Sequence, residues 1–371
     1  NTMNLAEIRK QLHKIPELGF EEKKTNEFIL SKLQKYSELK VHTFDFPGLL
    51  AEYKVNDDDF KLFRADMDGL PISEKTNCRF KSEHLGMMHA CGHDMHMTIL
   101  LGLIERVIQE QPEQNVLFLF QPAEEGRGGA KRILETGVFR EFSIDETYAL
   151  HVTDEFPTGT ISTKPGIFFA NTQELEVEFI GKSAHVAFPE NGKDAIAAAS
   201  EFYLDIQKRL NKKYPENKRV ICAFGKFNGG TAMNAVAEKC KLDGTFRAFS
   251  EADHHKLKNF IEKTAEDIAQ KYQLEHRINY LAYYKEVVND KDLFYQLEDS
   301  LKDSNVEIER SEKVFTGEDF GFFTDKYRGI LFWLGCRKAA DEKNGLHSTK
   351  FLPDEKALKI GVEIFWELLR N

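Results

Sequence analysis

The sequence predicts an α/β protein with two domains. In the first and last parts of the chain, short apolar runs of strand type alternate with segments of helical periodicity, which is the pattern of a mainly parallel sheet covered by helices. The middle part instead predicts the order β-α-β-β-α-β, typical of a ferredoxin-like α+β module. At 371 residues the chain also exceeds the length that one hydrophobic core usually serves. We therefore expect residues 1–171 and 284–371 to form one discontinuous domain, with residues 172–283 inserted into it.

The first part of the chain opens with two predicted helices, over residues 5–15 and 21–36, separated by Pro16. A third helix begins at His93 or Asp94, where the positive end of the helix dipole would disfavour a protonated imidazole. Strands are predicted over residues 40–46, 49–55, 62–65, 116–120 and 147–150. Active sites of such sheets lie beyond the carboxyl ends of the strands.

The inserted module and the last part of the chain complete the pattern. The module has predicted strands over residues 174–180, 220–227, 239–249 and 277–284, and helices over residues 194–210 and 251–272. The charged stretch 208–218 is predicted to be a solvated helix end and loop. A helix over 290–301, a strand over 330–334 and a closing helix over 354–369 then return to the first domain.

Charge and cysteine content restrict the class of protein. The chain has 51 basic and 61 acidic residues, for a net charge of −10, which disfavours nonspecific attraction to nucleic acid or anionic membrane. Its five cysteines are odd in number and scattered, unlike a disulfide framework. Apolar runs stay well short of the roughly 20 residues needed to span a bilayer. We expect a soluble cytoplasmic protein without nucleic-acid or membrane partners.

A metal-binding motif stands at the start of the third helix, where residues 89–94 read His-Ala-Cys-Gly-His-Asp. Thiolate and imidazole ligands suit zinc-like ions, whereas calcium and magnesium sites are built from oxygen. Cys91 and His93 are therefore candidate ligands. Two more histidines, His151 and His347, follow predicted strands and are candidate ligands from strand ends.

A pair of carboxylates, Glu124 and Glu125, follows the apolar run at residues 116–120. Adjacent carboxylates at a strand end can divide the work, one binding metal while the other acts as general base. Taken singly, each candidate has an ordinary explanation: His151 as a hydrogen-bonded polar residue, Cys91 as an inert buried thiol, the glutamates as a solvated helix start. Their occurrence together favours metal-dependent hydrolysis.

Several motifs together resemble the dinuclear metal-dependent aminoacylase and carboxypeptidase family, over nearly the whole chain. The resemblance rests on the Cys91 motif and on residues 64–71, 121–126, 181–185 and 345–347. Within that family the chain resembles the branch that holds hippurate hydrolases, auxin-conjugate amidohydrolases and bacterial N-acetyldiaminopimelate deacetylases, and residues 12–20, 169–172 and 234–238 are most similar to the last group. The resemblance implies a metallopeptidase-like catalytic domain with an inserted lid or dimerisation domain.

The resemblance also implies a set of residue roles. Cys91 would bridge two divalent metal ions, and Glu124 would act as general base and then as general acid. The remaining metal ligands implied are His93, Glu125, His151 and His347. Either Asp66 or Asp68 would support the site, and the sequence leaves open which. Asp66 and Cys91 stand where more distant members have histidine and aspartate, so zinc, manganese, cobalt and nickel remain open as the metal.

In the inserted module, the resemblance implies that His185 and Asn234 stabilise an oxyanion, in their own or a partner subunit's active site. Arg247 is a candidate clamp for a substrate carboxylate, or an ordinary exposed strand arginine. The expected reaction removes acetyl from N-acetyl-LL-2,6-diaminopimelate, giving diaminopimelate and acetate for lysine and cell-wall synthesis. The alternatives are an aminoacylase or hippurate hydrolase of broader specificity, and a catalytically inactive metal-binding protein. The amphipathic helices and edge strand of the module suggest a homodimer.

Overall fold

The computed structural model describes residues 3–213, 220–338 and 342–371, and the chain divides into two compact units. Unit 1 comprises Asn1–Phe168, Val287–Lys313 and Asp319–Asn371, and unit 2 comprises Phe169–Glu286 and Val314–Glu318. Unit 2 is thus slightly wider than the range 172–283 expected from the sequence, and the short segment that returns to it after Lys313 was not predicted.

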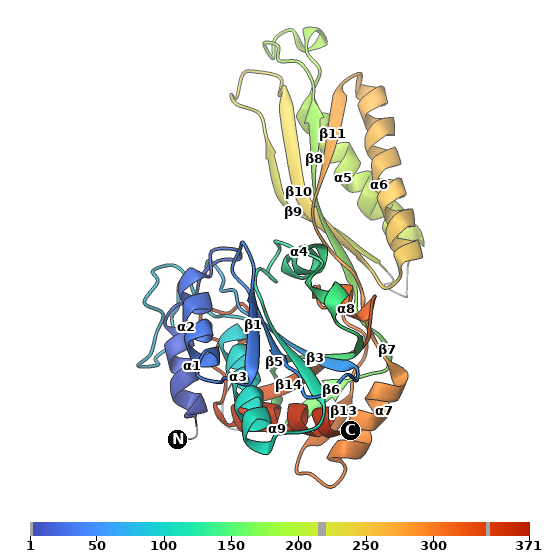
Figure 1. Cartoon of the computed structure of the whole chain (residues 1–371). Coiled ribbons are helices and arrows are strands. Elements are labelled where there is room, and N and C mark those ends of the chain that lie inside the picture. The colour runs from blue at the N-terminus through green and yellow to red at the C-terminus, as the bar shows by residue number, and fades with distance from the viewer. Residues whose placement is uncertain (1–2, 214–219, 339–341) are drawn as a thin grey trace. The chain divides into compact units, whose positions relative to one another are not determined.

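Unit 1 is built on an eight-stranded mixed sheet with the order β1-β2-β4-β3-β5-β14-β6-β13 (Figure 1). The strands are β1 (Leu39–Thr43), β2 (Leu49–Tyr53), β3 (Phe60–Asp66), β4 (Asn115–Gln121), β5 (Ile144–Pro157), β6 (Thr160–Thr163), β13 (Glu307–Arg310) and β14 (Arg328–Arg337). The central strands β4, β3, β5 and β14 run parallel to one another. The predicted α/β class is confirmed.

One sequence expectation about this sheet was wrong. β5 continues to Pro157, so His151 lies inside a strand and not at its end. The extension has a physical cause, because β14 pairs with β5 in parallel register from Arg328↔Glu146 to Gly335↔Thr153 and supplies hydrogen bonds beyond the predicted end. Strands β6 and β13, and the small sheet of β7 (Gly166–Phe169) and β12 (Val287–Asn289), were not predicted either.

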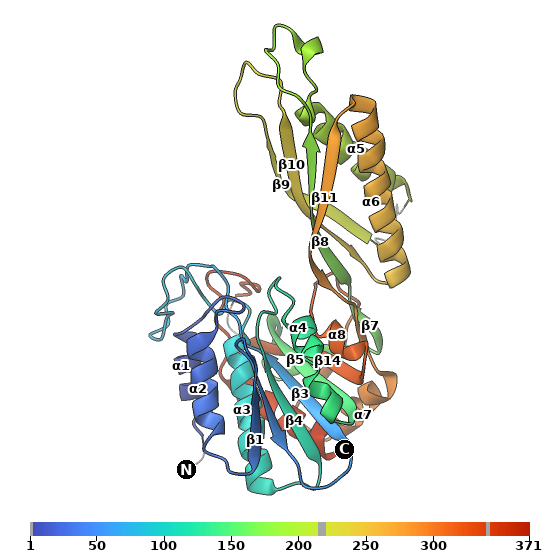
Figure 2. The same cartoon turned by 45° about the horizontal axis from the view of Figure 1, so that its top comes forward.

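The helices of unit 1 pack with this sheet, and most of them share one hydrophobic core (Figures 1 and 2). They are α1 (Leu5–His13), α2 (Lys23–Leu33), α3 (His93–Glu110), α4 (Gly129–Glu135), α7 (Lys291–Leu301), α8 (Gly321–Thr324) and α9 (Lys356–Arg370). α3 is buried along almost all of its length, which fits the continuous apolar run at residues 99–104 in its middle. Its N-terminus is thereby fixed beside the ends of β3 and β4.

Unit 2 has the predicted β-α-β-β-α-β order. Its elements are β8 (Asn171–Ile180), α5 (Ala195–Lys213), β9 (Val220–Gly229), β10 (Lys239–Ala248), α6 (Glu251–Tyr272) and β11 (Glu275–Tyr284). The antiparallel sheet has the order β11-β8-β10-β9, and both helices lie on the same side of it (Figures 1 and 2). Of the stretch 208–218, residues 208–213 end α5, and residues 214–218 lie outside the described residues.

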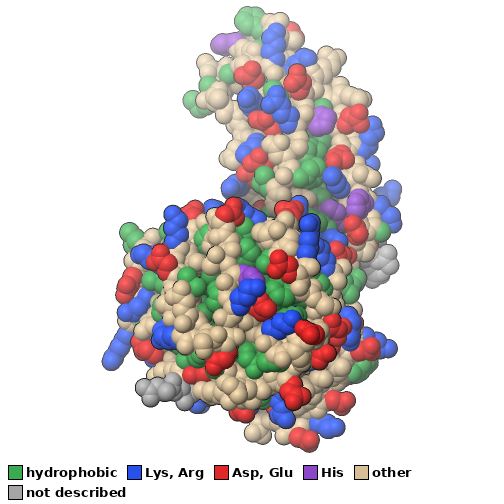
Figure 3. All heavy atoms as spheres, viewed as in Figure 1, with side chains coloured by type: hydrophobic (Ala, Val, Ile, Leu, Met, Phe, Trp, Pro, Cys, Tyr) green, Lys and Arg blue, Asp and Glu red, His purple; other side chains and the backbone are tan. Residues whose placement is uncertain are grey.

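Two surface properties bear on possible partners. Among the described residues, no helix combines the length and the apolar character that crossing a membrane requires. On the face of the molecule shown in Figure 3, basic and acidic side chains are interspersed and do not gather into a broad area of one charge.

Candidate metal centre

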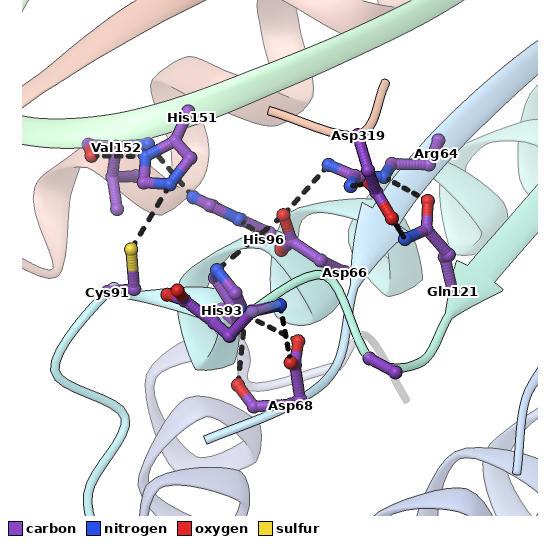
Figure 4. Close-up of polar contacts among 12 residues, drawn as sticks. Arg64, Asp66, Asp68, Cys91, His93, His96, Gln121, His151, Val152 and Asp319 are labelled. Atoms are coloured by element: carbon purple, nitrogen blue, oxygen red, sulfur yellow. Dashed lines mark hydrogen bonds and ion pairs between the residues drawn. The ribbon is translucent and has the colours of Figure 1, made fainter. Parts of the chain in front are cut away.

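Buried histidines and carboxylates converge in unit 1 where β3 and β4 end and α3 begins (Figure 4). Asp66 is the last residue of β3, His93 is the first residue of α3, and Glu124 and Glu125 follow β4. The ligand atoms of His93, Glu124 and Glu125 lie within 4.8 Å of one another, as do those of Cys91, His93 and His151. Seven predicted residues, Asp66, Asp68, Cys91, His93, Glu124, Glu125 and His151, are thus gathered here.

Gly92 allows Cys91 and His93 to face one site. It is the N-cap of α3 and has φ +85°, a left-handed conformation that side chains rarely adopt. A Cβ at this position would also lie 2.3 Å from Cγ2 of Val152. Only glycine therefore fits between the two candidate ligands, which accounts for the Cys-Gly-His order of the motif.

Asp68 orients His93. The Nδ1 atom of His93 lies 2.9 Å from the backbone oxygen of Asp68 and 3.2 Å from its Oδ1. Since a backbone carbonyl can only accept, Nδ1 carries the proton and the Nε2 lone pair is left for a ligand. Among the described residues Nε2 has no hydrogen-bond partner, although His93 is fully buried.

His151 is held in the same tautomer. Its Nδ1 lies 2.8 Å from the backbone oxygen of Val152, so Nδ1 donates and Nε2 keeps its lone pair. Nε2 faces the Cys91 sulfur at 3.4 Å. Burial, followed by the charge of His96, holds the pKa of His151 well below its usual range. This histidine is therefore neutral, as a metal ligand must be.

Glu125 and His347 form the open side of the cluster. Nε2 of His347 lies 3.1 Å from Oε1 of Glu125, and His347 is half exposed. The His347 backbone has φ +61° and donates to the Ala90 oxygen at 2.9 Å, which ties its loop to the segment before Cys91. The ligand atoms of Cys91, Glu125 and His347 also lie within 4.8 Å of one another. His347 therefore lies beside the Cys91 motif, although the two are far apart in the sequence.

The carboxylates and the thiol make this a site for cations. Burial and the charges of Glu125 and Glu124 raise the pKa of the Cys91 thiol well above its usual range. Burial lowers the pKa of His93, but Asp66 and Asp68 outweigh it and raise that pKa to about 10. In the cluster without a cation these carboxylates therefore favour a proton on His93 and outweigh the helix dipole, which we had expected to disfavour the protonated imidazole. A bound cation would take the place of that proton at Nε2. A divalent cation would balance these charges and make the thiolate stable.

Behind the cluster lies a buried network that sequence reasoning missed. Arg64 donates to Asp66 Oδ2 at 2.8 Å, to Asp319 Oδ1 at 2.7 Å and to Gln121 Oε1 at 2.9 Å (Figure 4). His96 Nδ1 lies 2.5 Å from Asp66 Oδ1, while its Nε2 accepts from the backbone N–H of Val152 at 2.9 Å. Both ring nitrogens of His96 are thus engaged.

One signal could have found His96. It lies three residues after His93 on a helix, where side chains share a face. Asp319 offered no such signal, because it is distant in the sequence.

Asp66 and Asp68 have different surroundings. Asp68 accepts from the backbone N–H of Glu125 at 2.9 Å and contacts His93, so it links the loop after β4 to α3. Asp66 is held between Arg64 and His96. Burial raises the pKa of Asp66, but His93, His96 and Arg64 hold it well below its usual range. Asp68 is therefore the carboxylate that touches two candidate ligands directly.

The other predicted residues lie in unit 2. His185 and Asn234 are neighbours there, since His185 bridges to Ala235 and the Val186 N–H donates to the Asn234 oxygen at 3.2 Å. Both side chains are exposed. Arg247 on β10 is partly buried and donates from Nη1 to the Phe315 oxygen at 2.6 Å. Its other guanidinium nitrogens form no described hydrogen bond, and burial lowers its pKa.

Comparison with known proteins shows the family of the chain. The model of the family described as peptidase family M20/M25/M40 matches residues 62–371. The chain is 40% identical, over 98% of its length and 96% of the relative's, to the N-acetyldiaminopimelate deacetylase of Bacillus pumilus.

Two solved structures are also similar. One is described as an aminohydrolase of methicillin-resistant Staphylococcus aureus, with TM-score 0.90, 27% identity and coverage of 99% and 95% of the two chains. The other is the Bacillus subtilis YXEP protein, described as a dinuclear metal binding peptidase, with TM-score 0.82, 28% identity and coverage of 99% and 96%.

Proposed function

The chain belongs to peptidase family M20/M25/M40, and from this membership and its site we propose that it is a metal-dependent amidohydrolase. Its substrate is N-acetyl-LL-2,6-diaminopimelate, which water cleaves to diaminopimelate and acetate. The observation that carries the proposal is the buried cluster of possible ligands. In it the Nε2 atoms of His93 and His151 lie beside the Cys91 thiol and the Glu125 carboxylate, and a second carboxylate, Glu124, remains for proton transfer. The name of the Bacillus pumilus relative supports the choice of substrate.

Two divalent metal ions fit the residues present. Cys91, His93, Glu125, His151 and His347 would hold them. When bound, these ions would polarise the amide carbonyl and lower the pKa of water towards neutrality. The mixed thiolate, imidazole and carboxylate donors leave zinc, manganese, cobalt and nickel open as the metal.

Glu124 is the general base and acid. It is buried at the cluster, and its neighbour Glu125 is the carboxylate that contacts His347. Glu124 takes the proton from the attacking water and returns it to the leaving amine nitrogen as the C–N bond breaks. Asp68 positions His93 and Glu125 for this step and does not touch the substrate.

Residues of unit 2 bind the substrate in this proposal. His185 and Asn234 donate hydrogen bonds to the developing oxyanion. Arg247 binds a substrate carboxylate through the guanidinium nitrogens that do not contact Phe315. Diaminopimelate carries two carboxylates, so a fixed arginine favours it over neutral amides.

The test is ninhydrin-detected release of diaminopimelate from N-acetyldiaminopimelate by manganese-, cobalt- and zinc-loaded protein. We expect turnover with at least one metal, and a loss of roughly 100- to 10,000-fold in Glu124→Gln. Glu135→Gln is the matched control, since that side chain is 64% exposed and pairs with Lys131 in the same helix.

Three outcomes separate the alternatives. Turnover of benzoyl-glycine with little of N-acetyldiaminopimelate would keep the mechanism and replace the substrate with that of a hippurate hydrolase. Broad turnover of N-acyl amino acids would indicate an aminoacylase. Metal-loaded protein that hydrolyses none of them would be a metal-binding protein without catalysis.

The protein also acts as a homodimer in the cytoplasm in this proposal. β9 is an edge strand of the four-stranded sheet, and unit 2 exposes Phe227 on β9 and Tyr203 and Leu204 on α5. Edge strands and apolar side chains of this kind favour pairing of two copies. Sedimentation that finds only the monomer mass would contradict the dimer.

A further inference from the structure

Unit 1 contains a second group of potential metal ligands outside the centre described above. His13 ends α1, and Glu74 and Cys78 lie in the connection between β3 and α3. Their ligand atoms lie within 4.8 Å of one another. His13 is fully buried, whereas Cys78 is half-buried, so an ion could reach the group from the surface.

The separations in this group are those of ligands around a tetrahedral ion. His13 Nε2 lies 3.4 Å from Glu74 Oε1, and Cys78 Sγ lies 3.5 Å from the same oxygen. Zinc bonds of about 2.0 Å to nitrogen or oxygen and about 2.3 Å to sulfur, at a tetrahedral angle, place these pairs about 3.3 Å and about 3.5 Å apart. These two separations therefore fit ligands of one ion, and the third pair, His13 Nε2 and Cys78 Sγ, lies within 4.8 Å.

His13 is oriented as metal-binding histidines are. Its Nδ1 lies 2.9 Å from Oδ2 of Asp94, which also accepts from Arg9 Nε at 2.7 Å and is therefore held as a carboxylate. Nδ1 donates to Asp94, and Nε2 points at Glu74 and Cys78. Despite complete burial, Nε2 has no partner with hydrogen-bond geometry among the described residues. Carboxylate–histidine–metal arrangements have this form.

Glu74 is also prepared for a cation. Its Oε2 accepts from the Ser82 N–H at 2.7 Å, and its Oε1 accepts from the Thr76 hydroxyl. Such hydrogen bonds fix the carboxylate without adding positive charge, as is usual around ligating carboxylates. The competing occupant is a proton on His13 Nε2, held as a buried imidazolium between Asp94 and Glu74.

We propose that His13, Glu74 and Cys78 bind one zinc-like ion at a third metal site, separate from the two ions of the catalytic centre. The site joins the end of α1 to the connection that precedes the Cys91 motif, and its role is structural. It does not depend on the substrate proposed above.

The test is metal content of the full-length protein. Protein reconstituted with excess zinc and then desalted is measured by inductively coupled plasma mass spectrometry. We expect Cys78→Ser to hold one zinc equivalent per chain fewer than wild type. Cys222→Ser, which removes a buried thiol in unit 2, is the matched control and keeps the wild-type content.

Cobalt reconstitution separates this site from the catalytic one. Both Cys91 and Cys78 would give thiolate-to-cobalt charge-transfer absorption, so the band that remains in Cys91→Ser reports Cys78 alone. We expect Cys91→Ser/Cys78→Ser to lose it. Equal zinc content in wild type and Cys78→Ser, with no Cys78-dependent band, would overturn the proposal and leave the buried imidazolium. An inactive protein that keeps the Cys78 band would contradict only the proposed function.

Discussion

In unit 1 the candidate ligands His93 and His151 are buried, and each donates its Nδ1 proton to a backbone oxygen. In unit 2 the candidate oxyanion donors His185 and Asn234 are exposed, and His185 Nδ1 contacts only the N–H of Ala187 two residues away. Burial thus fixes the direction of the rings in unit 1, whereas in unit 2 the Ala187 N–H sets only the tautomer of the exposed His185 ring, with the proton on Nε2. Unit 1 therefore carries a pre-organised centre, whereas the function proposed above requires the exposed residues of unit 2 to become ordered when substrate binds.

The largest expected effect is on metal binding and activity, and it tests the buried histidines of unit 1. His93→Gln removes the Nε2 lone pair, and we expect a loss of metal together with a fall in kcat/KM of about a thousandfold or more. His42→Gln is the control, because His42 lies on β1 and pairs with Glu52. Metal analysis and initial rates check the result. Wild-type metal content and activity in His93→Gln would remove the basis of the comparison.

Next in size is the effect on the exposed side. His185→Ala should lower kcat by roughly 100- to 1,000-fold, the usual cost of an oxyanion donor. Metal content and the unfolding midpoint should not change, because His185 is exposed. His255→Ala on α6 serves as the control, since His255 is exposed and its Nδ1 contacts a backbone oxygen in its own helix. A variant with normal kcat would show that the exposed histidine has no catalytic role.

The asymmetry also explains what the sequence could predict. Apolar periodicity identified most long elements, such as α3 and β8, because each of these buries one face or all of itself. The candidate ligands were found because Cys91, His93 and Glu125 stand in short motifs. The sequence did not predict contacts between distant segments. Pairing with β14 extends β5 past His151, and Asp319 accepts a hydrogen bond from Arg64 although the two residues are far apart in the sequence. Local patterns carry no information about such contacts.

Asp68→Asn tests the means by which unit 1 fixes its histidine. The amide cannot accept equally from both His93 Nδ1–H and the Glu125 N–H, so we expect metal affinity to fall about 10- to 100-fold. At saturating metal, kcat should recover most of its value. Asp57→Asn, at a fully exposed position, is the control. Chelator competition measures the affinity, and unchanged affinity would show that the backbone oxygen alone orients His93.

The smallest expected effect is on stability, and it tests whether a buried carboxyl of unit 1 has a structural role without binding metal. Glu22 is fully buried, and its Oε1 accepts from the N–H of Ala123, the residue directly before Glu124, at 2.8 Å. Burial, with the charge of Asp68, raises the pKa of Glu22 to about 8. A carboxyl whose folded pKa exceeds its ordinary value contributes stability below about pH 4.5 that is lost as the pH rises through 8.

Glu22→Gln keeps the accepting oxygen and removes the titration. In metal-depleted protein we therefore expect the variant to unfold in urea with about the wild-type free energy at pH 5, and to be more stable by roughly 1–3 kcal/mol at pH 9. The neighbouring Glu21→Gln, whose side chain is 60% exposed, should show no such difference. Parallel pH curves for Glu22→Gln and wild type would mean that Glu22 is charged in the folded protein. A gain confined to high pH would show that a buried acid can stand beside this centre as a neutral structural group, so burial alone does not mark the residues that bind metal.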